Sequence, residues 1–411
     1  MIHLLQTGDL HLGKIFYGFS LIEDQKFMLN QLIKTISEAK KQNPYHAVII
    51  TGDIYDRSIP PTEAIELFDE FLIELHQIDK DLKILLIPGN HDSAGRLSFG
   101  TRFLESQNIF ICTNPENIEN PVFIEGSEFS SNKNDGIYFY QIPFLSSGSL
   151  FSKDKNQRLT TQEELINEAI SRIKNFHYNN SETKNFKMGL NAHLFTLGGT
   201  SCDSERHFIG NAELINKNVF EDFSYVALGH LHKKQKVSEN IFYAGSPLAY
   251  SFDEANLEKS FLDITIDFSK ETSKVETKEI EINPLHKVTK LSGKFEEFID
   301  YAKNENSEFY KFKNDFLEIT CTDEILVENP VARLRDIFPN ILSVKQEVII
   351  KKQNKISNTE KKLLLNNEQN FNSEKIFMEF VKDVENVEDE NDWESTKKLF
   401  CKIEKTICKD E

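Results

Sequence analysis

Residues 47–57 have the sequence Ala-Val-Ile-Ile-Thr-Gly-Asp-Ile-Tyr-Asp-Arg. The branched apolar run Ala47–Ile50 is typical of a buried strand. Gly52 lets the backbone turn sharply after the strand and come close to a ligand. Loops at the carboxyl ends of strands are where α/β proteins build their sites. The segment therefore predicts a strand that presents Asp53 and Asp56 at such a site.

Four further segments repeat this order of apolar strand, turn and polar side chains. In three of them Gly8, Gly89 or Gly229 comes directly before the first polar residue. The strands and the residues that follow them are His3–Gln6 with Asp9 and His11, Ile84–Ile87 with Asn90, His91 and Asp92, Met188–Leu190 with His193, and Tyr225–Leu228 with His230 and His232. One such loop would mean little, but five in one chain indicate a shared site.

The rest of residues 1–265 alternates between strand and helix patterns. Two more short apolar runs, Tyr138–Ile142 and Ile241–Tyr243, predict strands. Two sets of apolar residues with helical spacing predict helices with one buried face. These sets are Leu29, Leu32, Ile33 and Ile36, and Ile65, Phe68, Leu72 and Leu75. The alternation predicts an α/β sandwich with its sheets covered by helices.

The sequence changes character after residue 265. Asp267–Glu281 is rich in charge and predicts an edge strand or a connector. The rest of residues 266–350 predicts a small α+β unit. It begins with a strand after residue 285. A helix at Lys294–Lys303, a strand at Phe316–Cys321, a helix at Asn329–Asp336 and a strand at Leu342–Ile350 follow.

The last part of the chain, residues 351–411, has no core of its own. Residues 351–372 are polar and predict a flexible linker. Residues 373–411 hold two amphipathic helix candidates, Ser373–Val384 and Trp393–Cys408. A helical hairpin this small cannot bury its own apolar face, so it needs something to pack against.

The donors after the strands suit a metal site. Oxygen comes from Asp9, Asp53 and Asn90, and imidazole nitrogen from His11, His193, His230 and His232. Mixed oxygen and nitrogen without thiolate favours Mn²⁺, Fe²⁺ or Zn²⁺. Seven ligands are too many for one such ion, but they suit two ions that share a carboxylate and clamp a phosphate.

Composition limits the possible settings. The five cysteines are scattered without a CxxC pair, which fits a reducing compartment and predicts a cytoplasmic protein. No apolar run is long enough to span a membrane, and no signal peptide is visible. The net charge of −18 counts against nucleic-acid binding, since phosphate contacts normally need a basic surface.

In order and spacing, residues 7–232 resemble the calcineurin-like metallophosphoesterase family. The matching blocks are Asp-x-His at 9–11, Gly-Asp-x-x-Asp at 52–56, Gly-Asn-His-Asp at 89–92, His193, and Gly-His-x-His at 229–232. More narrowly, residues 9–18 resemble SbcD-type nuclease subunits of double-strand-break repair, as do Asp203–Arg206 with Ile209-Gly210 and Gly245–Ser260. Close relatives often have Ser at the position of Gly8, which touches no ligand.

The resemblance implies roles for these residues. Asp9, His11 and His232 would hold one ion, Asn90, His193 and His230 the other, and Asp53 would bridge them. His91 would lie beside the phosphate and stabilise the transition state or protonate the leaving oxygen. Asp56 and Asp92 would orient His91 or a loop backbone.

The resemblance also implies an activity and partners. It implies a Mn²⁺-dependent nuclease with 3′→5′ exonuclease action on duplex DNA and endonuclease action on single strands and hairpins. It further implies an SbcC-type ATPase partner and a homodimer formed through helices. Because the chain has no Gly-x-x-x-x-Gly-Lys-Ser/Thr loop, ATP dependence would come from that other subunit. The helical tail would dock on the partner's coiled coil.

Two alternatives stay open. The acidic charge favours a metallophosphatase or cyclic-nucleotide phosphodiesterase that acts on small molecules or phosphoproteins. A non-catalytic scaffold that only anchors the ATPase is the other. Taken singly, each motif also has a structural explanation, such as a turn at Asp9 or Asp53 or a left-handed residue at Asn90. The remaining histidines, including His207 in a polar loop, show no partner pattern.

Overall fold

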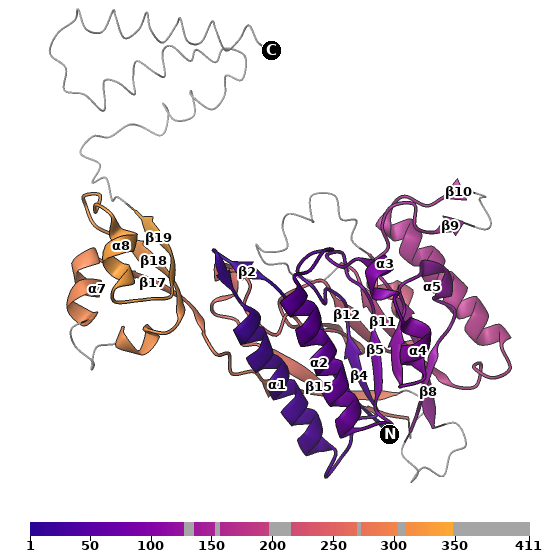
Figure 1. Cartoon of the computed structure of the whole chain (residues 1–411). Helices are drawn as coiled ribbons and strands as arrows, with labels where there is room; N and C mark the ends of the chain where they lie inside the picture. The colour runs from indigo at the N-terminus through magenta and orange to yellow at the C-terminus, as the bar shows by residue number, and fades with distance from the viewer. Residues whose placement is uncertain (127–134, 153–156, 197–214, 269–272, 303–308, 348–411) are drawn as a thin grey trace, which may run out of the picture. The chain divides into compact units, whose positions relative to one another are not determined.

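Two six-stranded sheets pack face to face at the centre of the fold (Figure 1). The computed structural model describes residues 1–126, 135–152, 157–196, 215–268, 273–302 and 309–347. Residues 1–348 form one compact unit and 349–411 a second. The predicted linker at 351–372 and helices at 373–411 lie outside the described residues.

The first sheet is mainly parallel. Strands β1, β4, β5 and β6 run in the same direction. At one edge, β15 runs antiparallel to β1, and β16 runs antiparallel to β15. In spatial order the strands are β16 (Lys274–Glu281), β15 (Ser260–Asp267), β1 (Ile2–Thr7), β4 (Ala47–Ile50), β5 (Lys83–Leu86) and β6 (Ile109–Ile111). The charged segment that ends at Glu281 is therefore the edge strand of this sheet, as predicted.

The second sheet has a parallel centre with antiparallel edges. In spatial order its strands are β13 (Gln235–Ser238), β14 (Ile241–Tyr243), β12 (Phe223–Gly229), β11 (Lys187–His193), β8 (Gly136–Ile142) and β7 (Val122–Glu125). Each of the seven predicted strands overlaps a strand of one of these sheets. Two short hairpins complete the strands of this part: β2 (Ile15–Phe16) with β3 (Phe19–Ser20), and β9 (Phe151–Ser152) with β10 (Gln157–Arg158).

The space between the sheets is an apolar core crossed by a few polar side chains. Leu4 and Ile49 from the first sheet pack in one cluster with Phe139 and Ala227 from the second. Near the carboxyl ends of the strands, the Gln6 amide donates to the carbonyl of Leu228 (3.3 Å) and the Asn191 amide to that of Ile50 (3.3 Å). These bonds tie the two sheets together just before the loops that carry the predicted site.

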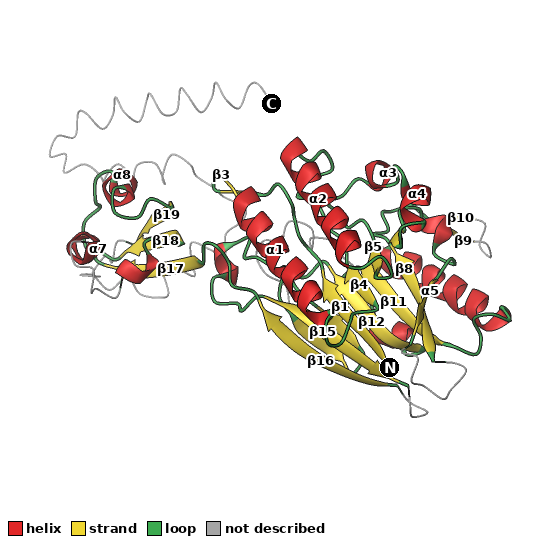
Figure 2. Cartoon of the chain, turned by 60° about the horizontal axis from the view of Figure 1, so that its bottom comes forward, coloured by secondary structure: helices red, strands yellow, loops and turns green. Residues whose placement is uncertain are grey.

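Three long helices cover the outer faces of the sandwich. Helices α1 (Ile22–Ala39) and α2 (Thr62–Ile78) lie over the first sheet, and α5 (Gln162–Asn179) packs on the second (Figure 2). Thr161 and Glu164 form a capping box at the start of α5, which satisfies backbone N–H groups there. The shorter helices are α3 (Ala94–Leu97) and α4 (Thr101–Glu105), with 3₁₀ turns at Pro115–Asn117, Lys217–Phe220, Phe252–Glu254 and Tyr310–Phe312.

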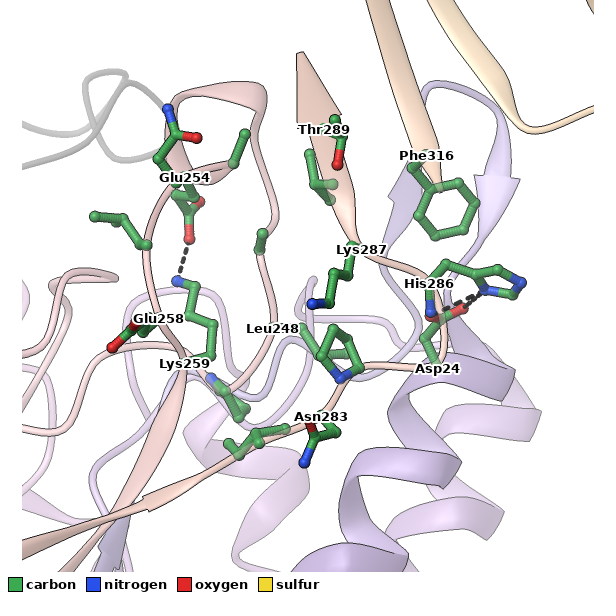
Figure 3. Close-up of a pocket in the computed structure, with 18 of the residues that line it drawn as sticks. Asp24, Leu248, Glu254, Glu258, Lys259, Asn283, His286, Lys287, Thr289 and Phe316 are labelled. Carbon is green, nitrogen blue, oxygen red and sulfur yellow. Dashed lines mark hydrogen bonds and ion pairs between the residues drawn. The ribbon is translucent and has the colours of Figure 1, made fainter. Parts of the chain in front are cut away.

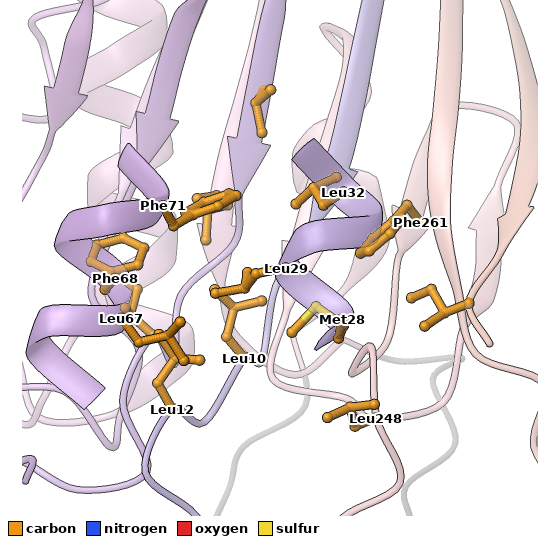
Figure 4. Close-up of a cluster of buried hydrophobic side chains, with 14 of the residues drawn as sticks. Leu10, Leu12, Met28, Leu29, Leu32, Leu67, Phe68, Phe71, Leu248 and Phe261 are labelled. Atoms are coloured by element: carbon orange, nitrogen blue, oxygen red, sulfur yellow. The ribbon is translucent and has the colours of Figure 1, made fainter. Parts of the chain in front are cut away.

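The buried face of α1 matches the prediction, and that of α2 matches it at Phe68 and Leu75 but not at Ile65. Leu29 and Leu32 of α1 point into the core beneath the helix (Figure 4). In α2 the predicted face is rotated, since Ile65 is 47% exposed. The buried residues are Ala64, Leu67, Phe68, Phe71 and Leu75. Apolar residues occupy most of this helix, so the spacing allowed more than one face, and the position of the sheet decides between them.

A small α+β unit follows the first sheet and confirms the predicted element order. Its parallel strands are β17 (Val288–Gly293), β18 (Phe316–Cys321) and β19 (Ile341–Gln346), and its helices are α7 (Phe295–Ala302) and α8 (Pro330–Arg335). Phe298, Leu317 and Phe338 form a separate apolar cluster inside it. The unit contacts the sandwich through a Lys290–Asp253 ion pair (3.1 Å), and its Val288 and Phe316 pack in the apolar core beneath α1.

Candidate metal centre

The loops that follow β1, β4, β5 and β12 meet at one edge of the sandwich, together with the last residue of β11. The backbone N–H of Asp9 donates to the carbonyl of Gly52 (2.9 Å), and that of His11 to the carbonyl of Asp53 (2.9 Å). The backbone N–H of His230 donates to Asp9 Oδ1 across the two sheets (3.0 Å). The predicted residues therefore converge from both sheets.

One pair of imidazoles faces nitrogen to nitrogen. The Nε2 atoms of His11 and His232 are 3.1 Å apart, although the residues are 221 positions apart in the chain. Two such nitrogens repel each other unless they share a proton or bind the same cation. Nitrogens about 2.1 Å from one ion would lie about 3.0–3.4 Å apart at octahedral to tetrahedral angles. The pair therefore has the spacing of two ligands to one metal ion.

A second group forms around the side-chain oxygen of Asn90. Its Oδ1 atom lies 3.0 Å from Nε2 of His193 and 3.1 Å from Nδ1 of His230. The amide nitrogen of Asn90 is buried and has no hydrogen-bond partner among the described residues. This group also offers one oxygen and two nitrogen donors at ligand spacing.

Asp53 lies between the two groups. Its Oδ2 atom is 3.8 Å from Nε2 of His11 and 3.5 Å from Nε2 of His193. Ligand atoms of His11, Asp53 and His91 lie within 4.8 Å of one another, as do those of Asp9, Asp53 and His193. The carboxylate of Asp53 belongs to both triads, of which the first includes His91 and the second places Asp9 with His193.

Known proteins are similar to this chain over most of its length. The model of the calcineurin-like phosphoesterase family matches residues 2–234. A protein of Staphylococcus epidermidis named as the D subunit of the nuclease SbcCD is 31% identical over 353 residues, which cover 85% of this chain and 87% of that protein. The chain belongs to the calcineurin-like phosphoesterase family and, within it, to the SbcD family of nuclease subunits.

Two further likenesses accompany this result. A protein of Staphylococcus saprophyticus with the same name is 30% identical, with 83% of this chain and 84% of that protein covered. The crystal structure of TT1561 of Thermus thermophilus matches 68% of this chain and 98% of that one, at 13% identity and a TM-score of 0.37. As a calcineurin-like phosphoesterase, the chain is a metal-dependent phosphodiesterase, and its donor set fits divalent cations.

In this phosphoesterase each of three site histidines has one ring nitrogen held by a neighbour. Nδ1 of His193 lies 2.8 Å from the carbonyl oxygen of Thr51, to which it donates. Nδ1 of His232 lies 3.2 Å from Oε1 of Glu254, and Nδ1 of His91 lies 2.9 Å from the carbonyl oxygen of Asp56. Such contacts set the tautomer and direct the other nitrogen toward a metal or substrate.

Burial keeps three of the four candidate metal-binding imidazoles neutral. Burial lowers the pKa of His11 well below its usual value. Burial lowers the pKa of His193 as well. Burial lowers the pKa of His230 to about 3. Because only a neutral imidazole has a lone pair for a metal, these histidines are in the binding form at neutral pH.

The two remaining predicted carboxylates lie beside the donors. Asp92 accepts the backbone N–H groups of Ile54, Tyr55 and Gly89 at 2.8–3.0 Å, so it joins the loop after β4 to the loop after β5. Burial and the charge of Asp53 raise the pKa of Asp92. The carboxylate of Asp56 lies 2.8 Å from Nζ of Lys14.

Gly52 turns the chain as predicted, but the other glycines of these loops act differently. Only Gly52 has a positive φ angle (95°), while Asp9, His11, Asp53 and His230 themselves adopt positive φ values of 50°, 44°, 48° and 103°. A Cβ on Gly89 would lie 2.1 Å from Oδ1 of Asp53, and one on Gly229 would lie 1.9 Å from the carbonyl oxygen of Thr51. These two glycines therefore let strand ends approach each other. The strained backbone is at the polar residues, as is common at functional sites.

Sequence reasoning missed two supports of the site, Thr51 and Glu254. Both lie in segments noted in the sequence, residues 47–57 and Gly245–Ser260, but no local pattern shows which histidine each one contacts. The predicted Asp203–Arg206 loop and His207 lie outside the described residues. Within the described part of the chain, no helix is both long and apolar enough to cross a membrane.

Proposed function

We propose that this phosphoesterase is a Mn²⁺-dependent DNA nuclease subunit. In this proposal it degrades duplex DNA from 3′ to 5′, cuts single strands and hairpins, and works in the cytoplasm with an SbcC-type ATPase. The observation that carries the proposal is the pair of donor groups that share Asp53. The two staphylococcal relatives, which are named as subunits of the nuclease SbcCD, support the choice of DNA as substrate and of the partner.

Two ions would divide the donors between them. Asp9, His11 and His232 would hold one ion, Asn90, His193 and His230 the other, and Asp53 would contact both. The close approach of His11 to His232, and of Asn90 to both of its histidines, supports this division. When bound, such ions neutralise phosphate oxygens and supply a hydroxide nucleophile near neutral pH.

His91 would serve the leaving group. The carbonyl oxygen of Asp56 holds its Nδ1, so the imidazole would donate a proton from Nε2 to the leaving 3′ oxygen. Its backbone N–H also donates to Oδ1 of Asp53 (2.9 Å), which ties the ring to the bridging carboxylate. Asp56 would orient the ring of His91. Asp92 would orient the backbones of the loops after β4 and β5.

The acidic charge supports a second candidate. A net charge of −18 weakens the attraction of the chain for DNA phosphates and favours a phosphatase or cyclic-nucleotide phosphodiesterase. Rates with Mn²⁺ on blunt duplex DNA, a cyclic nucleotide and a phosphoprotein separate the two. We expect DNA to be cleaved fastest, from its 3′ ends. Faster turnover of the cyclic nucleotide or the phosphoprotein would refute the nuclease proposal.

We also propose a division of labour along the chain. Residues 1–265 would form the catalytic domain, 266–350 a cap that faces DNA, 351–372 a linker and 373–411 a segment that docks on the ATPase coiled coil. The separate apolar cluster around Phe298 supports the cap. Deletion of residues 373–411 should abolish co-purification with the ATPase while Mn²⁺-dependent hydrolysis of a small phosphodiester persists. Co-purification of the shortened chain would refute the docking role.

A homodimer would use the helices of the catalytic domain. Phe99 and Phe103, on the segment of α3 and α4, are 90% and 71% exposed. Exposed aromatic side chains so close together are typical of an interaction surface. Sedimentation of the chain should give a dimer, and Phe103→Ser should shift it toward the monomer. A wild-type monomer at micromolar concentration would refute this part of the proposal.

A further inference from the structure

A buried carboxylate lies behind His232. Glu254, at the end of the 3₁₀ turn Phe252–Glu254, is 0% exposed. Its Oε1 atom is 3.2 Å from Nδ1 of His232, and its Oε2 atom is 2.6 Å from Nζ of Lys259. Figure 3 shows the ammonium of Lys259 and this carboxylate facing each other. Both residues lie in the stretch Gly245–Ser260 that resembles SbcD-type subunits, but outside the five blocks that carry the metal donors.

The same lysine also holds the backbone of His232. Its Nζ atom donates to the carbonyl oxygen of His232 (3.1 Å) and to Oγ of Ser246 (2.8 Å). The Ser246 hydroxyl lies 3.1 Å from the second carboxylate oxygen of Glu254. The ion pair of Glu254 and Lys259 therefore holds both the ring and the main chain of His232.

Stability does not account for this pair. Removing a carboxylate and an ammonium from water costs several kcal/mol per ion, which their attraction offsets only in part. The ammonium of Lys259 lies 2.6 Å from Oε2 of Glu254 and favours the ionised carboxylate. Such a carboxylate accepts a hydrogen bond from Nδ1–H of His232.

We propose that Glu254 is a positioning residue that, paired with Lys259, fixes the tautomer and orientation of His232 so that Nε2 faces the metal. This role depends on the proposed function, in which His232 and His11 bind the same ion. Carboxylates that hold a metal-binding histidine in this way typically raise metal affinity 10- to 100-fold. Loss of Glu254 should therefore lower the affinity for one of the two ions and leave the affinity for the other unchanged.

The test is a Mn²⁺ titration of the full-length chain. The electron paramagnetic resonance signal of free Mn²⁺ measures how much of the metal is bound. We expect two bound ions in the wild type. Glu254→Gln and Lys259→Met should each bind one ion 10- to 100-fold more weakly and the other normally. A wild type that binds fewer than two ions would refute the proposed function itself, which separates that failure from a failure of this proposal.

A matched control is the partly buried pair of His3 and Asp263 at the opposite end of β1. Nε2 of His3 lies 2.9 Å from Oδ1 of Asp263, so Asp263→Asn removes the same kind of contact away from the site. This variant should bind both ions as the wild type does. If it loses one ion as well, the effect is general destabilisation and the proposal is wrong.

A double variant guards against misfolding. Glu254→Gln with Lys259→Met leaves no uncompensated charge in the interior, so it should fold even if a single variant does not. Circular dichroism and urea unfolding establish that it is folded. A folded double variant that binds two ions with wild-type affinity overturns the proposal, and selective loss of one ion supports it.

Discussion

Gly229→Ala tests whether the close approach of the two sheets builds the metal centre. The added Cβ would lie 1.9 Å from the carbonyl oxygen of Thr51 and 2.9 Å from Nδ1 of His193. Real contacts of this kind do not fall below 3.0 Å, so the two strand ends must separate by at least 3.0 − 1.9 = 1.1 Å. The same carbonyl accepts the hydrogen bond of His193 at 2.8 Å, so its movement displaces a proposed ligand.

The expected magnitudes follow from this displacement. Overpacking of a dense interior costs about 1–3 kcal/mol of unfolding free energy. A misplacement of about 1 Å at a catalytic site costs about 100-fold in rate. Gly229→Ala should therefore lose about 1–3 kcal/mol in urea unfolding, and kcat/KM for Mn²⁺-dependent DNA hydrolysis should fall about 100-fold.

Gly95→Ala is the matched control. Gly95 lies in α3, close in sequence to Asp92, and a Cβ there meets no atom within 4 Å. Alanine is the better helix former by about 0.5–1 kcal/mol, so this variant should keep both stability and activity. If Gly229→Ala matches Gly95→Ala in unfolding free energy, metal stoichiometry and rate, the steric reasoning is refuted.

Three further predictions follow from the same geometry. His91→Ala should lower kcat about 10²–10⁴-fold with both Mn²⁺ ions still bound; loss of an ion in the titration would instead make His91 a ligand. Below pH 6.5 the unfolded chain protonates His230, whereas the folded state, with a pKa of about 3, does not. As pH falls, this residue should therefore lower the unfolding free energy of the metal-free protein by about 1.4 kcal/mol per pH unit. In urea unfolding, the unfolding free energy of His230→Gln should depend less steeply on pH by that amount. Phe298→Ala should lower the unfolding free energy of the cap by about 3–5 kcal/mol. Hydrogen exchange should then rise in β17–β19 alone, and an equal rise in β1 would contradict a separate cap core.

Much of the fold was predictable because the strands are marked locally. A buried strand such as Ala47–Ile50 needs branched apolar residues whatever its neighbours are. The same holds for β14 at Ile241–Tyr243 and β18 at Phe316–Cys321, whose predicted bounds match the structure. Helix faces were less secure, as α2 shows, because an apolar residue such as Ile65 satisfies the helical pattern and still faces solvent.

The donor residues were also visible in the sequence, since each follows a predicted strand. Asp9, Asp53 and Asn90 occupy turns that any α/β protein places at the carboxyl edge of a sheet. Recurrence of this pattern in five segments made a metal site the economical explanation. The sequence by itself therefore determined many of the central strands, the candidate donors and the family to which they belong.

Only the tertiary structure decided how these residues meet. The pairing of His11 with His232 and the support of His193 by Thr51 join residues 221 and 142 positions apart. Glu254 reaches His232 from a turn within Gly245–Ser260, and the sequence does not show that contact. Local spacing sets which way a side chain leaves its own strand, but distances across two sheets depend on how the sheets pack. That packing follows from the inter-sheet core, to which distant parts of the chain contribute together.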